Sequence, residues 1–120
     1  MVIGRGAVWW ADLGTPTRSG LGFRRPVGVV QREDLNRSRI GTLVCIPVTS
    51  NLRCADAPGN SRLVSDVTGL PKDSAANVSQ TVAIAKSVRT DRVGKLPRAK
   101  LELLLAGIDV VLGRVSRLSG

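Results

Sequence analysis

The chain has 120 residues, 18 of them lysine or arginine and 9 acidic, which gives a formal net charge of +9. This length predicts one domain, residues 1–120, that is large enough to bury a core. The hydrophobic content of 42% excludes a disordered chain. No apolar run approaches the roughly 18–20 residues of a membrane span. The first apolar run leads directly to Asp12 and is too short for a signal segment, so we expect a cytoplasmic protein.

Arginine makes up most of the positive charge. Its planar guanidinium fits phosphate, so an arginine-rich surplus favours a nucleic acid or another polyanion as partner. The alternative explanations are solubility alone and a genome rich in G and C, which favours arginine codons. The densest positive stretch is residues 18–39, where Arg18, Arg24 and Arg25 are followed by three further arginines.

The two cysteines, Cys45 and Cys54, have no histidine to join them, because the chain contains none. Their spacing matches no zinc motif. We therefore expect two free thiols, no metal and no cofactor.

The first half of the chain alternates short apolar runs with polar loops. Residues 7–13 predict a strand, and residues 14–22 a loop that is either a plain connector or a flap over a bound polyanion. Residues 26–32 predict a second strand, with Pro26 at its first position. Residues 33–39 predict a turn or short helix.

The second half begins with an almost continuously apolar run, residues 42–48, which predicts a central strand. Pro47 within this run indicates a bulge or a sheet edge at that point. The elements expected after it are a loop over 50–60, a strand over 62–67, a turn over 70–73, one or two strands over 74–85, and a helical turn over 90–93.

A helix that starts at Pro97 is the clearest C-terminal element. One apolar face follows from the helical spacing of Leu101, Leu104, Leu105, Ile108, Leu112 and Val115. Further apolar residues widen this face, which indicates either a subunit interface or additional core packing. Altogether the pattern predicts an α+β, mainly β protein: a small antiparallel barrel with a long C-terminal helix.

An ordered set of short motifs resembles the MazF/PemK family of toxin endoribonucleases, in particular its actinobacterial members. The motifs cover nearly the whole chain: Gly6-x-Val8-Trp9-x-x-Asp12-Leu13, Arg25-Pro26-Val27-x-Val29-Val30-Gln31, Val48-Thr49-Ser50-Asn51, Leu70-Pro71-Lys72-Asp73-Ser74 and Thr90-Asp91-Arg92-Val93-Gly94.

This resemblance implies an SH3-like barrel, a homodimer, and sequence-specific, metal-independent cleavage of single-stranded RNA. It also implies a cognate antitoxin with an acidic tail that covers the RNA groove. The family's catalytic arginine and threonine match Arg25 and Thr49, and a position that lines the RNA path matches Gln80. Many members carry a glutamate in the first loop, which is absent from residues 17–23 here.

RNA is cut without a metal when its 2′-OH attacks the adjacent phosphate, a step that needs charge stabilisation and proton transfers. The chain has no histidine and no tyrosine for the proton transfers. Arg25 can stabilise the developing phosphorane charge, and Thr49 can donate a hydrogen bond to a phosphate oxygen. The remaining candidates for RNA binding are Arg18, Arg24, Asn36, Ser50, Asn51 and Gln80.

Two alternatives stay open at this point. The same fold serves toxins that poison DNA gyrase, although those typically end in a tryptophan and this chain ends in Gly120. The other alternative is a barrel that binds RNA without cutting it.

Overall fold

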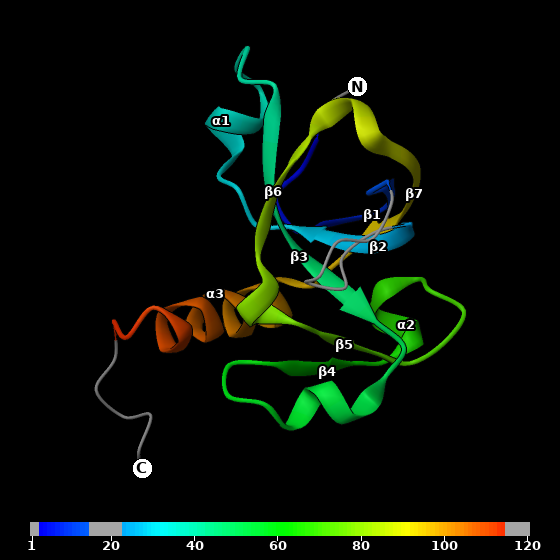
Figure 1. The fold of residues 1–120 in the computed structure, drawn as a ribbon, viewed down its shortest axis with the longest axis vertical. Helices are drawn as coiled ribbons and strands as arrows, with labels where there is room; N and C mark the ends of the chain where they lie inside the picture. Colours follow the sequence, from blue (N-terminus) through cyan, green and yellow to red (C-terminus); the bar gives the residue numbers. More distant parts are fainter. Residues whose placement is uncertain (1–2, 15–22, 115–120) are drawn as a thin grey trace.

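The computed structural model describes residues 3–14 and 23–114, which form a curled antiparallel sheet with one long helix (Figure 1). The strands follow the order β4-β5-β3-β2-β1-β7, and β6 also pairs with β3. The strands are β1 (Ala7–Asp12), β2 (Arg24–Val29), β3 (Thr42–Thr49), β4 (Ser61–Leu63), β5 (Ser74–Ala76), β6 (Val82–Ala85) and β7 (Arg89–Lys95). The helices are α1 (Glu33–Asn36), α2 (Ser65–Thr68) and α3 (Arg98–Val111), with 3₁₀ turns η1 (Leu52–Asp56), η2 (Val78–Gln80) and η3 (Lys86–Val88). This architecture confirms the predicted fold class.

The sheet buries apolar side chains on both faces, because alternate residues of a strand point to opposite sides. One face of β1 and β2 contributes Trp9 and Val27 to a cluster inside the curl. The other face contributes Val8 to a second cluster, together with Ile46 of β3 and Leu104 of α3. The central strands are therefore held from two sides, which fixes the positions of their ends.

α3 begins at Arg98, one residue after the predicted start, and Pro97 is its N-cap. Leu104 is buried, and Leu101, Leu105 and Ile108 of the predicted face pack against the second cluster. Gly107 lies so close to Gly59 that a Cβ on either residue would overlap the other's carbonyl oxygen. This close contact explains a glycine in the middle of the helix.

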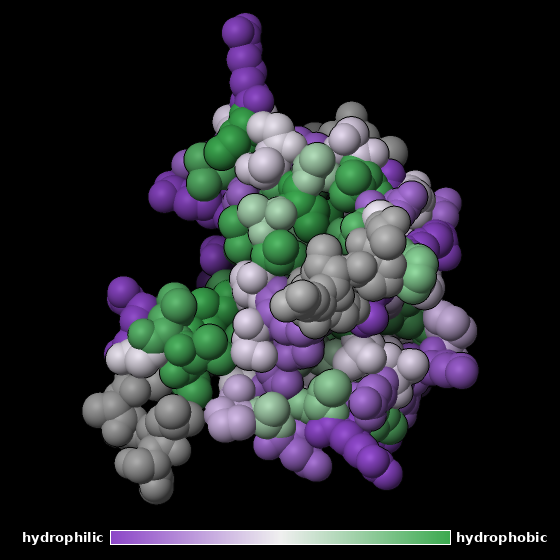
Figure 2. Space-filling model, in the orientation of Figure 1, coloured by the Kyte–Doolittle hydropathy of each residue, from purple (hydrophilic) through white to green (hydrophobic). Residues whose placement is uncertain are grey.

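Part of the apolar surface of α3 faces away from the core. Leu112, expected on the buried face, is 66% exposed, and Leu103 and Val111 are also exposed. Val115 lies outside the described residues. Figure 2 shows a hydrophobic surface over α3. The additional apolar residues therefore do not all serve the core of this chain.

Two local predictions are wrong. The strand expected over 62–67 ends at Leu63, and α2 follows it, with Gly69 in the left-handed conformation (φ 83°) as the C-cap of the helix. The helical turn expected over 90–93 is part of β7, which pairs with β1. Register shifts along this pairing break the alternation of side chains, so β7 has no regular strand pattern in the sequence.

Pro47 lies at the predicted local edge of β3. On one side of β3, the pairing with β6 ends at Cys45 and the pairing with β5 begins at Val48. Proline lacks a backbone N–H, so it fits in the gap between these two partners, while its carbonyl accepts a hydrogen bond from the backbone of Asn77 (2.9 Å).

The two strands found within residues 74–85, β5 and β6, match the prediction for that stretch.

The two cysteines are free thiols, as expected. Cys45 is buried between strands, and this burial raises the pKa of its thiol to about 12. The Cys45 side chain therefore serves the core and stays protonated at neutral pH.

Candidate active site

A cleft of about 440 Å³ lies where β2 begins and β3 ends. β2 starts at Arg24, two residues earlier than predicted, so both arginines belong to the strand rather than to the loop before it. The cleft is lined by Trp10, Arg24, Arg25, Pro26, Val48, Thr49, Ser50, Leu70, Pro71, Lys72 and Ser74.

Arg25 and Thr49 lie just beyond the paired part of β2 and β3. The register runs from Val29–Cys45 to Val27–Pro47. Arg25 precedes the last pair by two residues on β2, Thr49 follows it by two residues on β3, and both line the cleft. The two residues with predicted catalytic roles thus lie on neighbouring strand ends in one cleft.

The hydroxyl of Thr49 also orders the chain that follows it. Its Oγ1 accepts a hydrogen bond from the backbone N–H of Asn51 (3.1 Å). A threonine hydroxyl has one proton to donate and two lone pairs. This contact therefore uses an acceptor position and leaves the proton for a ligand in the cleft.

The opposite wall is the turn between α2 and β5. The carboxylate of Asp73 accepts hydrogen bonds from the backbone N–H of Ser65 (2.9 Å) and from Arg62 (3.1 Å). These two contacts hold the pKa of Asp73 below its ordinary value, and the contact with the Ser65 backbone has the larger effect. The turn that they fix brings Lys72 to the cleft. Lys72 lies in the turn predicted over 70–73, but it was not among the predicted site residues.

Arg24 is held on the surface by two neighbours. Its guanidinium carbon lies 4.4 Å from the centroid of the Trp10 ring, a cation–π distance. Its Nη2 lies 2.6 Å from Oδ2 of Asp91 on β7. Trp10 lies in the strand predicted over 7–13, but its stacking with Arg24 was not predicted.

The charge in the cleft is of one sign. Arg24, Arg25 and Lys72 are its ionised residues, and the described lining includes no carboxylate. A concave site lined with guanidinium and ammonium groups attracts anions, and arginine binds phosphate through two parallel N–H donors. The arrangement suits a phosphodiester backbone or another polyanion.

The other candidates for RNA binding differ in position. Ser50 lines the cleft. Asn51 is exposed outside it and caps η1 by accepting a hydrogen bond from the backbone N–H of Arg53 (3.2 Å). Gln80 is half-buried in η2, where its Oε1 accepts a hydrogen bond from Asn77 (2.9 Å), and it does not line the cleft. Arg18 lies outside the described residues.

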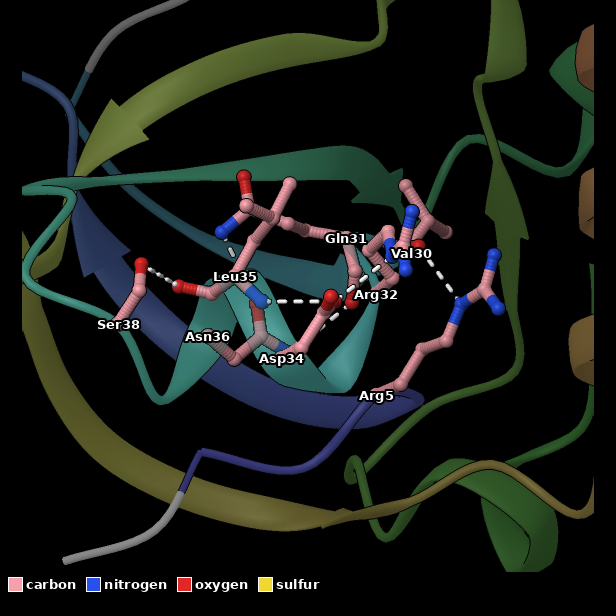
Figure 3. Close-up of polar contacts among 8 residues, drawn as sticks. All are labelled: Arg5, Val30, Gln31, Arg32, Asp34, Leu35, Asn36 and Ser38. Carbon is pink, nitrogen blue, oxygen red and sulfur yellow. Dashed lines mark hydrogen bonds and ion pairs between the residues drawn. The ribbon is translucent and has the colours of Figure 1, made fainter.

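Asn36 requires a correction, because the residue is only 4% exposed. Its Nδ2 donates to the backbone oxygen of Gln31 (2.9 Å), and its Oδ1 accepts from Nε2 of the same glutamine (3.0 Å) (Figure 3). An amide whose donor and acceptor are both bonded within the protein is unsuited to reading a base. We therefore assign Asn36 a structural role and withdraw it from the RNA-binding candidates.

Within residues 3–14 and 23–114, no group of three or more histidine, cysteine, aspartate or glutamate side chains is arranged to hold a metal ion. In the same ranges, none of the helices is long and apolar enough to span a membrane.

Comparisons with known proteins agree over nearly the whole chain. Residues 4–112 match the family described as PemK-like, MazF-like toxins of type II toxin–antitoxin systems. The chain is 42% identical over 112 residues to Endoribonuclease MazF6 of Mycobacterium tuberculosis, which covers 93% of this chain and 98% of that protein. MazF of Deinococcus radiodurans has a similar structure, with a TM-score of 0.78 at 20% identity over 94% of this chain and 98% of that one. A mycobacterial endoribonuclease in complex with its cognate antitoxin gives a TM-score of 0.69 at 19% identity and 91% coverage of both chains.

Proposed function

The chain belongs to the PemK-like, MazF-like toxins of type II toxin–antitoxin systems, and we propose that its cleft cuts single-stranded RNA at specific sequences without a metal ion. Its relative at 42% identity is named an endoribonuclease, so endoribonuclease activity follows from the family. The gyrase-poisoning alternative and the non-catalytic alternative are not favoured for the same reason.

One observation carries the proposal: Arg25 and Thr49 end neighbouring strands in a cleft whose charged lining is entirely positive. Attack of the 2′-OH on the phosphate places additional negative charge on the phosphorane oxygens. Arg25 stabilises that charge through its guanidinium, and Thr49 donates its hydroxyl proton to a non-bridging oxygen. Arg24 and Lys72 bind the neighbouring backbone phosphates and hold the chain for in-line attack.

The lining side chains serve positioning and charge stabilisation rather than proton transfer. Arginine and lysine hold their protons near neutral pH, and the alcohol of Thr49 is a poor base without a partner. We therefore assign no general base among them. Ser50, beside Thr49, is placed to contact the RNA in the cleft, while Asn51, Gln80 and Arg18 remain predicted contacts along its path.

The proposed partners follow from charge and exposed apolar surface. A solved relative is a complex with its cognate antitoxin, and an acidic antitoxin segment would complement the cationic cleft of this chain. The exposed residues Leu103, Val111 and Leu112 on and after α3 favour a homodimer, since a second copy would cover them. We propose that the dimer acts on mRNA in the cytoplasm.

The test is incubation of the purified protein with a long single-stranded RNA in the presence of EDTA. We expect discrete cuts that leave a 2′,3′-cyclic phosphate, because the attacking group is the 2′-OH. Arg25→Ala abolishes the cuts, whereas Arg32→Ala, which removes an exposed arginine outside the cleft, preserves them. Binding without cleavage, or cleavage only with added metal, contradicts the proposal.

A further inference from the structure

The side chain of Arg24 contacts residues of two other strands, β1 and β7. Arg24 starts β2, its guanidinium lies over Trp10 of β1, and its Nη2 reaches Asp91 of β7 at 2.6 Å. In the sheet, β1 lies between β2 and β7. Adjacent strands are about 4.8 Å apart, so the Arg24 side chain extends over the whole width of β1 to reach this carboxylate.

Asp91 brings a negative charge next to a cleft whose described lining contains none. A carboxylate and a phosphodiester both present two oxygens to a guanidinium, so they compete for the same N–H groups. A phosphate in contact with Arg24 would also lie within a few ångströms of Asp91, and the two like charges repel each other. Asp91 occupies Nη2 of Arg24, so a phosphate that binds Arg24 through this nitrogen competes with the carboxylate for it.

The ion pair between Arg24 and Asp91 is weak enough to be broken by a ligand. The side chains of Arg24 and Asp91 are 49% and 69% exposed, and an ion pair this accessible is screened by water and salt. The stacking on Trp10 does not depend on the carboxylate, so it keeps the guanidinium at the cleft after Asp91 moves away. The backbone of Trp10 is itself linked to β7, since its oxygen accepts a hydrogen bond from Thr90 (3.2 Å).

We propose that Asp91 is an internal counter-ion for Arg24 that competes with the RNA backbone. It holds the guanidinium in the free protein and is displaced when a phosphate enters the cleft. This competition lowers the affinity of the cleft for any polyanion and makes stable binding depend on the other contacts of the RNA. The inference rests on the proposed function only in taking RNA as the ligand.

The experiment measures binding separately from cleavage. A fluorescent 2′-O-methyl oligoribonucleotide has no free 2′-OH and cannot be cut, so its dissociation constant is read directly by anisotropy. We expect Asp91→Asn to bind it about fivefold more tightly at low salt, with a smaller gain at high salt. The matched control is Asp34→Asn, which removes the same charge from an exposed pair with Arg32 (2.7 Å) outside the cleft and changes binding less than about twofold.

A double-mutant cycle with Arg24→Gln tests whether Asp91 affects RNA binding through Arg24. If Asp91 acts through Arg24, Asp91→Asn gives no gain in the Arg24→Gln protein. An equal gain in both backgrounds shows only a long-range charge effect and overturns the inference. The inference is also overturned if Asp91→Asn binds the oligonucleotide no more tightly than wild type does, or if no variant binds it. Cleavage of unmodified RNA is assayed in parallel: a wild type that binds but does not cut overturns the proposed function and leaves this inference intact.

Discussion

The two ends of the β2–β3 pair carry similar polar side chains but use them in different ways. At the α1 end, the amides of Gln31 and Asn36 are buried and bonded to each other (Figure 3). The Gln31 amide also bonds to the backbone of Thr42 and Val44 in β3. At the other end, Arg25 and Thr49 face a cleft of about 440 Å³. Polar groups satisfied inside the protein stabilise the fold, whereas polar groups gathered in a cleft remain able to bind a ligand. The predictions below test this division, from the largest expected effect to the smallest.

The largest effect is expected at the cleft end, from Arg25→Ala. Loss of the donor that stabilises the phosphorane lowers the single-turnover cleavage rate about 10²- to 10³-fold. Arg25→Lys restores only part of the rate, because lysine keeps the charge but lacks the planar fork. Arg32→Ala, at the α1 end, leaves the rate near that of wild type. Similar rates for the two alanine variants would remove the distinction between the ends.

Thr49→Val is expected to slow cleavage about 10- to 100-fold, since it deletes one hydrogen bond to a charged group. Thr49→Ser, which keeps the hydroxyl, recovers most of the rate. The control is Thr42→Val at the opposite end of the same strand, where the side chain is exposed and lies outside the cleft. A Thr42→Val rate as low as that of Thr49→Val argues for a general effect on β3.

Asn36→Ala tests the α1 end through stability. Its removal deletes the hydrogen bonds that Asn36 makes with the Nε2 and the backbone oxygen of Gln31, although Nε2 keeps its bond to Thr42. The free energy of unfolding therefore falls by about 1–3 kcal/mol in urea titrations. The cleavage rate per folded molecule stays unchanged. Asn51→Ala, which removes an exposed helix cap, costs about 1 kcal/mol or less. Unchanged stability with slower cleavage in Asn36→Ala would restore Asn36 to the site.

The smallest effect concerns Asp73, whose pKa is lowered in the folded state by the Ser65 backbone and by Arg62. A lowered pKa contributes stability above the unfolded value of 3.8, and this contribution is lost as the pH falls through the folded value. Asp73→Asn therefore lowers the melting temperature slightly at pH 7, and the difference from wild type shrinks below pH 3.8. A difference that stays constant from pH 7 to pH 2 contradicts this assignment.

The sequence by itself determined the elements with strong local patterns. The apolar runs of β2 and β3, and the helical spacing of α3, express periodicities that are visible without tertiary contacts. Arg25 and Thr49 became candidates through the resemblance of their motifs to the family; the structure places both in the cleft, and their catalytic roles stay predictions. β7 was not predictable from the sequence. The polar stretch around Thr90 forms a strand because it pairs with β1, and this pairing contains register shifts.

Only the tertiary structure decided which polar residues share a surface. Trp10, Arg24 and Asp91 come from three strands. Lys72 reaches the cleft through a turn that Asp73 fixes by accepting a hydrogen bond from the backbone of Ser65. Asn36 resembles a surface amide in the sequence, yet packing against Gln31 buries it. Local sequence specifies the conformation of a segment, but the burial and charge environment of a side chain depend on segments distant in the chain, which only the folded sheet brings together.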